Sequence, residues 1–290
     1  MKIGVTGSNG LVGKALIKKL KEKKFEVIEC NHTNCDVTNI EQVKKSLKGA
    51  NIIVHCAAKL DEHAKDLFEV NVKGTENVLE AASENRVRQF IFLSSVAVFG
   101  KSAGLKNEET TPNPETRYEK SKWEAEQMVL SYQEIFPVTI FRPAIIVGKS
   151  NYWSKIIKII KKDFPLIGDG SNHWQLVSLE NVVNAILFSI KNEDCFEETF
   201  MLCDDEAMTL KELAEFIRKE SGMKKPLKRV PVFLGKIIAF INGYLKIVPL
   251  LDLDYLKRMI RDRHYSNKKI KSLGFEFKFS TKESLRKLMK

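Results

Sequence analysis

The chain has 290 residues, of which 43% are hydrophobic and 29% are charged, proportions that are ordinary for a globular protein in water. This length suffices for one large domain or two unequal ones, and no uncharged apolar run reaches the roughly 18 residues of a membrane span. The formal net charge is +11, and from residue 224 onward 18 Lys and Arg residues stand against five Asp and Glu residues. We interpret this excess as a solvated basic surface and expect no nucleic-acid partner, because no aromatic side chains are interleaved with the basic ones.

The cysteines show none of the paired spacings that bind zinc. There are five of them, Cys30, Cys35, Cys56, Cys195 and Cys203. We expect reduced thiols, no disulfide framework and no metal site, as in a cytoplasmic protein. The first predicted strand begins at residue 2 without a secretory leader before it, which also favours a cytoplasmic location.

The N-terminal segment predicts a nucleotide-binding turn. Residues 2–6 form a short apolar run suited to a buried strand, and Leu16, Ile17 and Leu20 have helical spacing. A GxxGxxG turn occupies residues 7–13 between them. Glycines let a pyrophosphate approach the backbone, and the N-terminus of the helix offers free N–H groups. The alternative is a plain turn between a strand and a helix.

Strand-like and helix-like segments then alternate through the first half of the chain. Further strands are predicted at residues 25–28, 52–55, 89–93 and 138–141, and helices at 71–82 and 121–132. This alternation predicts an α/β fold with a Rossmann-type doubly wound parallel sheet.

The second half of the chain predicts a smaller, interleaved substrate domain. Pro165 and the glycine turn at 168–170 indicate an excursion from the sheet, and residues 176–190 resemble a strand and helix that return to it. An amphipathic helix follows at 209–221. We therefore expect a dinucleotide-binding domain made of residues 1–148 plus about 176–203. The substrate domain would comprise about 149–175 plus 204–290.

A YxxxK motif predicts the proton-transfer site. Tyr118 and Lys122 are four residues apart and share one face of a helix. A nearby ammonium favours phenolate, which would lower the pKa of the tyrosine and make it a usable acid or base. Tyr265 and Lys269 have the same spacing, but they lie in the basic tail with no sheet edge before them. We expect catalysis from Tyr118 and none from Tyr265.

Ser95 stands at the carboxyl end of a predicted parallel strand, the edge where open α/β sheets bind ligands. Its hydroxyl could hydrogen-bond the reacting oxygen beside Tyr118 and Lys122; the alternative is a serine that merely caps the strand. A Ser-His-Asp hydrolase is not expected, because no GxSxG elbow is present and the histidines lack a supporting acidic pattern.

Taken together, these motifs resemble the extended short-chain dehydrogenase/reductase superfamily, specifically its NAD-dependent epimerase/dehydratase group. The segments that carry the resemblance are the N-terminal TGxxGxxG, His55–Ala58, Asn71–Thr75, Leu93–Gly100, Tyr118–Glu126, Arg142–Pro143 and Lys271–Phe275.

The resemblance implies NAD or NADP as the cofactor and a role for each matching residue. Ser95 would orient the substrate oxygen, Tyr118 would exchange its proton, and Lys122 would bind the nicotinamide ribose. We expect the following residues to contact the cofactor: Gly7, Asn9, Gly10, Leu11, Val12, Gly13, Asn31, His32, Asp36, Val37, Ala57, Ala58, Lys59, Asn71, Ser94, Tyr118, Lys122, Phe141 and Pro143. Among them the glycines would hold the pyrophosphate, while Asp36 and Val37 would flank the adenine.

Departures from the family pattern suggest which branch is involved. Val96 and Ala97 replace the acidic pair of the dehydratases, so no dehydratase activity is expected. Residues 144–147 lack the diphosphate-binding asparagine of the epimerases, and Trp174 stands where an arginine is often found. These losses favour the hydroxysteroid-dehydrogenase-like or carbonyl-reductase-like branches and an apolar substrate. Arg229, Arg258 and Arg261 are the residues best suited to support a nucleotide sugar instead.

The apolar stretch at residues 230–251 allows three interpretations. Its polar residues Lys236, Asn242, Gly243 and Lys246 fall mostly on one side. It could be a lid over an apolar substrate, a helix on a membrane surface, or an ordinary packing helix.

The end of the second strand indicates which cofactor is used. An acidic residue there would select NAD, and a basic one would select NADP. The position holds the neutral Asn31, and no Lys or Arg lies between Lys24 and Lys44. With His32 as the only candidate for a phosphate, the sequence favours NAD.

The leading hypothesis is an NAD(P)-dependent oxidoreductase that moves hydride between a nicotinamide and a secondary alcohol or ketone. The alternatives are a nucleotide-sugar 4-epimerase with tightly bound NAD, and a non-catalytic dinucleotide-binding or nucleic-acid-binding protein. A small-molecule substrate is expected, and a homodimer or a peripheral membrane contact would be compatible with the sequence.

Overall fold

The computed structural model describes residues 1–247 and 253–290 and is built around a parallel six-stranded sheet. Its strands follow the order β10-β6-β4-β3-β1-β2, and every neighbouring pair is parallel. They are β1 (Lys2–Thr6), β2 (Glu26–Cys30), β3 (Ile52–His55), β4 (Gln89–Leu93), β6 (Val138–Pro143) and β10 (Glu198–Leu202). The strand order reverses beside β1, as in a doubly wound Rossmann sheet, so the predicted fold class is confirmed.

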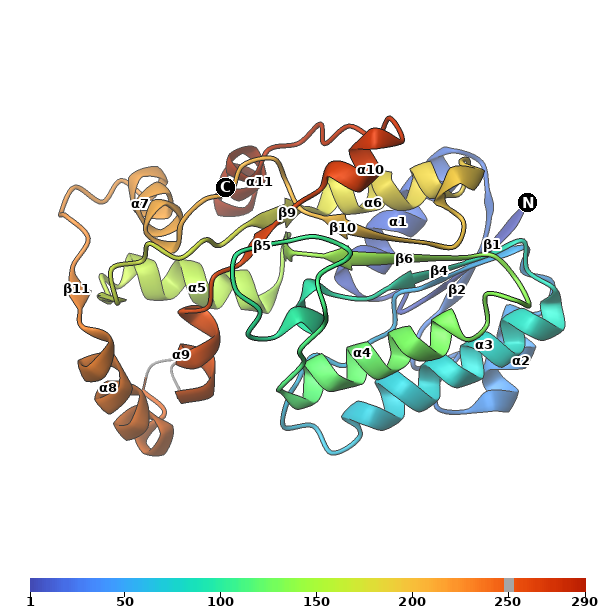
Figure 1. Ribbon diagram of the computed structural model, residues 1–290, viewed down its shortest axis with the longest axis horizontal. Coiled ribbons are helices and arrows are strands. Elements are labelled where there is room, and N and C mark those ends of the chain that lie inside the picture. Colours follow the sequence, from blue (N-terminus) through green and yellow to red (C-terminus); the bar gives the residue numbers. More distant parts are fainter. Residues whose placement is uncertain (248–252) are drawn as a thin grey trace.

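Helices cover both faces of this sheet (Figure 1). Helices α1 (Leu11–Glu22) and α6 (Leu179–Ser189) pack together on one face. Helices α2 (Ile40–Leu47), α3 (Gly74–Asn85) and α4 (Arg117–Leu130) pack on the other. Each helix buries an apolar stripe against the strands, with Leu16 and Leu20 of α1 fully buried.

A second group of helices gathers at the other end of the molecule (Figure 1). They are α5 (Asn151–Lys161), α7 (Leu210–Glu220), α8 (Val232–Leu245) and α9 (Leu253–Met259), with the short strands β8 (Leu166–Ile167) and β11 (Arg229–Val230) between them. Trp153, Leu213 and Ile217 form part of a separate buried cluster there. The split between a dinucleotide domain and a substrate domain, with its residue bounds, stays a prediction.

The last helices connect the two ends of the molecule. Helix α10 (Lys268–Ser272) packs against β10, whereas α11 (Thr281–Met289) packs against α7 and the pair β7 (Ile145–Val147) and β9 (Leu176–Ser178). A further short pair, β5 (Leu105–Lys106) and β12 (His264–Tyr265), joins the first half of the chain to the basic tail.

The predicted return to the sheet at residues 176–177 is not where the chain rejoins it. Strand β9 pairs with β7 outside the central sheet, and β10 forms the sheet edge beside β6 instead. Strand β10 begins with Glu198 and Thr199, which leaves only three consecutive apolar residues, a run too short to predict a strand. Helix α2 was also not predicted, and a π-helical turn at Glu69–Lys73 precedes α3.

The prediction that all cysteines are reduced is wrong for two of them. Cys30 and Cys35 form a disulfide, whereas Cys56, Cys195 and Cys203 are free thiols. The chain turns back directly after β2, where the Cys35 N–H donates to the Asn31 carbonyl at 2.8 Å. This turn brings the two Cα atoms to 5.1 Å, within the usual span of a disulfide.

Part of the predicted apolar stretch at 230–251 forms α8, and residues 248–251 lie outside the described part of the chain. Among the described residues, no helix is both long and apolar enough to cross a bilayer.

A buried ion pair attaches α4 to the sheet. Glu126 of α4 is fully buried and accepts hydrogen bonds from the Arg142 guanidinium of β6, including the Nε–H at 3.1 Å. The Ser94 hydroxyl donates to the same carboxylate at 2.6 Å. The pair therefore fixes the helix that carries Tyr118 and Lys122 relative to the end of β4.

We expect Glu126→Gln to lower the free energy of unfolding by about 3–5 kcal/mol, because it leaves the Arg142 charge buried without its partner. Denaturant-induced unfolding would measure the loss. Glu22→Gln is the control, since Glu22 forms an exposed ion pair with Lys19 and its removal should hardly move the midpoint. Equal effects of the two substitutions would contradict this assignment.

Candidate functional site

The glycine turn brings β1, β3 and α1 into close contact. Gly7 has φ = +65°, and a Cβ there would lie 2.7 Å from the backbone nitrogen of Ala57. A Cβ on Gly13 would collide with the carbonyl oxygen of Gly7. Both positions therefore require glycine: Gly7 for its left-handed backbone, and Gly13 for the close approach of helix to turn.

The same turn suits a pyrophosphate. Helix α1 has no side chain that caps its N-terminus and no acidic residue in its first turn, which leaves positive helix-dipole charge at this point. The buried Ser8 hydroxyl has no hydrogen-bond partner among the described residues. Gly10 is the N-cap, and a Cβ there would meet only the Gly7 carbonyl oxygen, at 3.1 Å. Asn9, Leu11 and Val12 complete the turn and the start of the helix.

The predicted adenine-side residues lie after β2. The Asn31 carboxamide oxygen accepts from the Thr33 N–H at 3.0 Å, and His32 is exposed beside it. Asp36 accepts from the Thr38 N–H, also at 3.0 Å, while Val37 is buried against Gly74. The residues thus stand together at the carboxyl edge of the sheet, and their contacts with the cofactor stay predictions.

Asn71 ties the segment after β3 to α4. It lies in the π-helical turn, where its side chain accepts from the Lys59 N–H at 2.7 Å and donates to the Lys59 carbonyl at 3.0 Å. It also donates to the Ser121 hydroxyl at 2.9 Å, and that hydroxyl donates to the Tyr118 carbonyl. Asn71 therefore positions both the segment Ala57–Lys59 and α4.

Three other predicted cofactor contacts are occupied or buried. The Ser94 hydroxyl is bound to Glu126, and the Phe141 carbonyl accepts from the Ser94 N–H at 2.8 Å. The Phe141 ring lies in the core against Phe200, so its side chain is not available to a ligand. Pro143 ends β6 and is buried.

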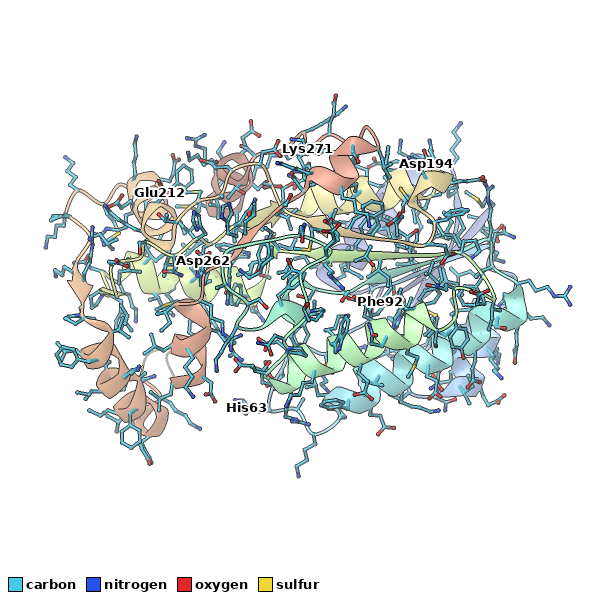
Figure 2. The ribbon with its side chains drawn as sticks, viewed as in Figure 1. His63, Phe92, Asp194, Glu212, Asp262 and Lys271 are labelled. Carbon is cyan, nitrogen blue, oxygen red and sulfur yellow. A yellow bond between two sulfur atoms is a disulfide. The ribbon has the colours of Figure 1, made fainter. Side chains whose placement is uncertain are left out.

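Ser95, Tyr118 and Lys122 come together at the carboxyl edge of the sheet. Ser95 caps the short 3-10 helix Val96–Phe99 and hydrogen-bonds the Tyr118 side chain. The Lys122 ammonium donates to the Leu93 carbonyl at 2.7 Å and lies 4.5 Å from the centre of the Phe92 ring, which Figure 2 labels. The hydroxyl, phenol and ammonium thus stand on adjoining elements, which the sequence predicted.

The electrostatics differ from the prediction that Lys122 lowers the pKa of Tyr118. Burial raises the pKa of Tyr118 to about 12, against the lowering effect of its hydrogen bond with Ser95. Burial also lowers the pKa of Lys122 to about 8. The ammonium is therefore charged below about pH 8, but in this arrangement it points to the Leu93 carbonyl and not to the phenol.

Tyr265, the second match to the tyrosine motif, is a core residue. It lies in β12, and burial raises its pKa. Lys269 pairs with Glu198. This placement agrees with the expectation that Tyr265 has no part in catalysis.

Arg258 in α9 and Arg261 just after it form ion pairs with acidic residues in and near the start of α4. Arg258 pairs with Glu62 at 3.1 Å, and the other Glu62 oxygen accepts from the Tyr118 N–H at 2.9 Å. Arg261 pairs with Glu115 at 2.6 Å and with Glu119 at 2.8 Å. These acidic partners were not predicted, because they lie more than 140 residues from the arginines in the sequence.

Two further positions singled out from the sequence are Arg229 and Trp174. Arg229 is exposed in β11. Trp174 is buried, and the Arg263 guanidinium lies 4.7 Å from the centre of its ring. A guanidinium group therefore lies beside Trp174, although position 174 itself holds tryptophan and not the arginine often found there.

A histidine with an acidic partner also lies here, which the sequence did not indicate. The ring Nδ1 of His173 is 2.8 Å from an Asp262 carboxylate oxygen, and the ring stacks on His264 with 4.2 Å between centres. Donor atoms of the three residues lie within 4.8 Å of one another. Figure 2 labels Asp262 between the sheet and the outer helices. Lys106 adds positive charge beside Asp262, which disfavours a cation there.

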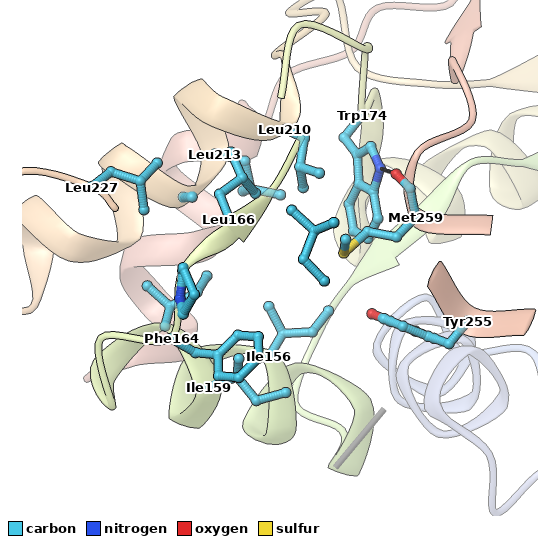
Figure 3. Close-up of a pocket in the computed structure, with 14 residues that line it drawn as sticks. Ile156, Ile159, Phe164, Leu166, Trp174, Leu210, Leu213, Leu227, Tyr255 and Met259 are labelled. Carbon is cyan, nitrogen blue, oxygen red and sulfur yellow. Dashed lines mark hydrogen bonds between the residues drawn. The ribbon is translucent and has the colours of Figure 1, made fainter. Parts of the chain in front are cut away.

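An apolar cavity of about 90 Å³ lies among the outer helices (Figure 3). Ile156 of α5, Leu213 of α7, Trp174 and Met259 line it, and the Tyr255 hydroxyl is directed toward it in Figure 3. None of Ser95, Tyr118 and Lys122 lines this cavity, so it is not the place where the phenol meets its substrate.

Comparison with known proteins identifies relatives of this chain. Residues 3–201 match the profile of the NAD dependent epimerase/dehydratase family. An N-acetyl-alpha-D-glucosaminyl-diphospho-ditrans,octacis-undecaprenol 4-epimerase from Escherichia coli O157:H7 is 30% identical over 222 residues, which cover 72% of this chain and 65% of that protein. The match thus spans less than two thirds of that relative. A UDP-glucose 4-epimerase from Vibrio cholerae is 29% identical over 85% of this chain and 84% of that protein.

Other matches agree at the level of the fold. A short-chain dehydrogenase/reductase superfamily protein from Agrobacterium tumefaciens, solved with bound NAD, covers 99% of this chain and 96% of its own, at a TM-score of 0.80 and 20% identity. A sterol-4-alpha-carboxylate 3-dehydrogenase from Dictyostelium discoideum is 25% identical over 76% of each chain. These matches do not single out the hydroxysteroid-dehydrogenase-like branch that the sequence favoured.

We expect Gly10→Val to abolish binding of NAD(H) and NADP(H) without unfolding the protein. The new side chain projects beside the N–H groups at the start of α1, and its Cβ would meet only the Gly7 carbonyl oxygen, at 3.1 Å, which a small shift of the turn relieves. Titration calorimetry measures the affinity, and circular dichroism checks the fold. Gly243→Val in α8 is the control, since nothing lies near a Cβ there. Unchanged dinucleotide affinity in a folded Gly10→Val protein would contradict the site.

Proposed function

The chain belongs to the NAD dependent epimerase/dehydratase family, and we propose that it is a 4-epimerase for a sugar attached to a diphosphate. It is an enzyme that uses NAD or NADP. In this proposal Ser95, Tyr118 and Lys122 act on a secondary alcohol of the sugar. The observation that carries the proposal is the placement of Arg258 and Arg261 against the acidic residues around Tyr118.

The arginines support a diphosphate for a physical reason. A diphosphate in a closed site requires directed donors, and guanidinium groups supply them in pairs. The Arg261 side chain is 16% exposed and Arg258 27%, so both are partly withdrawn from water. Glu62, Glu115 and Glu119 hold them beside the catalytic helix, where a substrate diphosphate could replace the carboxylates.

The activities of two relatives point the same way. Both are 4-epimerases, one of a sugar on diphospho-undecaprenol and one of UDP-glucose. The diphosphate-linked sugar is common to both, so the proposal is limited to that class and leaves the carrier to the assay.

Two of the three arguments for an apolar substrate lose their force, while the lack of a diphosphate-binding asparagine at residues 144–147 still stands. The Arg263 guanidinium stacks on the Trp174 ring, so a guanidinium group is present beside residue 174. Helix α8 directs its large apolar side chains outward, away from any role as a lid over Tyr118. Oxidation of an apolar alcohol, as in the sterol dehydrogenase relative, therefore ranks second.

The glycine turn and the N-terminus of α1 would hold NAD(P), which would supply the chemistry that accepts a hydride from the sugar carbon and returns it to the opposite face of that carbon. The Tyr118 oxygen removes the proton from the adjacent hydroxyl and returns it when the hydride comes back. Ser95 donates a hydrogen bond to the same substrate oxygen and holds it beside the phenol. Lys122 contributes positive charge that favours phenolate once the ammonium turns from the Leu93 carbonyl.

We expect Tyr118→Phe to lower the rate of epimerisation about 10²–10⁴-fold, because a positioned acid and base is lost. Tyr265→Phe should keep near-normal turnover, since Tyr265 is a core residue and the ring is retained. Turnover of UDP-N-acetylglucosamine and of its diphospho-undecaprenol counterpart measures both. A larger loss from Tyr265→Phe would contradict the site.

Formation of a 4-keto-6-deoxy product would contradict the expectation, based on Val96 and Ala97, that this enzyme is not a dehydratase.

We expect Arg261→Gln to raise the KM for the diphosphate sugar about tenfold or more, since a charge-assisted hydrogen bond is worth roughly 1.5–3 kcal/mol. Dinucleotide affinity should stay unchanged, because Arg261 lies away from the glycine turn. Arg88→Gln is the control, as Arg88 forms an exposed pair with Glu193. An unchanged KM for Arg261→Gln, or stabilisation by apolar ketones and not by UDP-sugars in a thermal-shift screen, would reverse the order of the two candidate functions.

A further inference from the structure

Helix α8 turns its small residues toward the protein and its large apolar residues outward. Its inner side is built of small or polar residues: Gly235, Ala239 and Asn242 are buried. A Cβ on Gly235 would collide with Ile167 of β8, so the helix lies close against that strand. Ala239 and Ile167 share a small buried cluster with Leu256 of α9. The helix is therefore fixed to the protein by this side alone.

The opposite side carries the large residues. We define the outer face of α8 as Phe233, Ile237, Phe240, Ile241 and Tyr244. Each of them is between 50% and 76% exposed. Their spacing of three and four residues places them on one stripe of the helix. A surface helix ordinarily presents polar residues on this stripe, so the outer face of α8 marks an interaction surface.

The surroundings of this face are basic. The sequence from residue 221 to residue 251 holds six Lys and Arg residues and no Asp or Glu. Among the described residues, Lys228 pairs with Asp163, whereas no ion pair involves Lys224, Lys225, Lys236 or Lys246. All four of these lysines are exposed. An apolar stripe and unpaired positive charge thus occur on the same segment.

The segment also lies where it can meet an extended surface. Figure 1 places α8 at the end of the molecule away from the central sheet. Its 14 residues give a length of about 21 Å at 1.5 Å per residue, less than the roughly 30 Å hydrocarbon core of a bilayer. A helix of this length lies along a membrane surface and does not span it.

We propose that the outer face of α8 docks on an anionic lipid bilayer. Phe233, Ile237, Phe240, Ile241 and Tyr244 insert at the boundary between headgroups and acyl chains, and the lysines around them contact acidic headgroups. Leu245 at the end of the helix and Ile247 just after it are also exposed and continue the apolar surface. The bilayer satisfies both properties of the segment, whereas an uncharged apolar surface would leave the lysines without partners.

A second copy of the chain fits this face less well. A symmetric dimer through α8 would bring the same segment of both copies together. Lys236 and Lys246 would then approach their own equivalents, and the segment offers no acidic residue to offset the repulsion.

The test is co-sedimentation of the full-length protein with lipid vesicles. The protein should bind phosphatidylcholine vesicles that contain phosphatidylglycerol, and added salt should weaken the binding. Pure phosphatidylcholine vesicles should bind it much less. Ile237→Ser combined with Phe240→Ser should weaken the partition more than about tenfold, because two apolar side chains stay in water. Ile135→Ser is the matched control, since Ile135 is 58% exposed elsewhere and its loss should leave binding unchanged.

A second variant makes the result independent of expression or folding of the double mutant. Phe240→Trp should show a blue shift of its fluorescence on addition of anionic vesicles, and quenching by brominated lipids. Absence of both effects would overturn the proposal. Equal binding to pure phosphatidylcholine vesicles would also overturn it. A dimer detected by light scattering would overturn it too, if Ile237→Ser combined with Phe240→Ser abolishes that dimer. The proposal does not rest on the proposed catalysis, because vesicle binding is measured without substrate.

Discussion

The close packing of the glycine turn is the constraint on which the rest of the site depends. Gly7 lies against the backbone of Ala57, and Gly13 lies against the Gly7 carbonyl, so β1, β3 and α1 meet without intervening side chains. This contact aims the N-terminus of α1 along the carboxyl edge of the sheet. Ser95 follows β4 at the same edge, and α4 brings Tyr118 and Lys122 to it. A dinucleotide bound at the turn can therefore extend toward the phenol.

Polar links hold the catalytic helix over this edge and connect it to the outer helices. Glu126 joins α4 to Arg142 of β6 and to Ser94 after β4. The hydrogen bond between Asn71 and Ser121 holds the first turns of the helix. Glu62, Glu115 and Glu119 then join the same helix to Arg258 and Arg261. These ion pairs thus connect α9 and the residues after it to the surroundings of Tyr118. His55 is held as a structural residue: burial lowers its pKa to about 3, and it hydrogen-bonds Thr6 and Thr75 as a neutral ring.

Local patterns in the sequence predicted what is local in the structure. The strand, turn and helix of residues 2–22 and the i,i+4 pair Tyr118 and Lys122 are encoded in short segments, and both were recognised. The disulfide of Cys30 with Cys35 depends on a turn whose geometry the spacing does not specify. The pairs His173–Asp262 and Arg261–Glu119 join residues that only the folded chain brings together. Edge strand β10 was missed because Glu198 and Thr199 interrupt the apolar pattern that the inner strands have.

The central claim is that the hydride removed from a sugar carbon is returned to the opposite face of the same carbon, while Tyr118 removes and returns the proton of the hydroxyl on that carbon. The most direct measurement uses UDP-N-acetylglucosamine and its diphospho-undecaprenol counterpart, each deuterated at C4, with mass spectrometry of the products. The account predicts an epimer that keeps its deuterium, with no label in water and no net reduction of added NAD. Loss of the label to solvent, or its accumulation in free NADH with a ketone product, would contradict the claim.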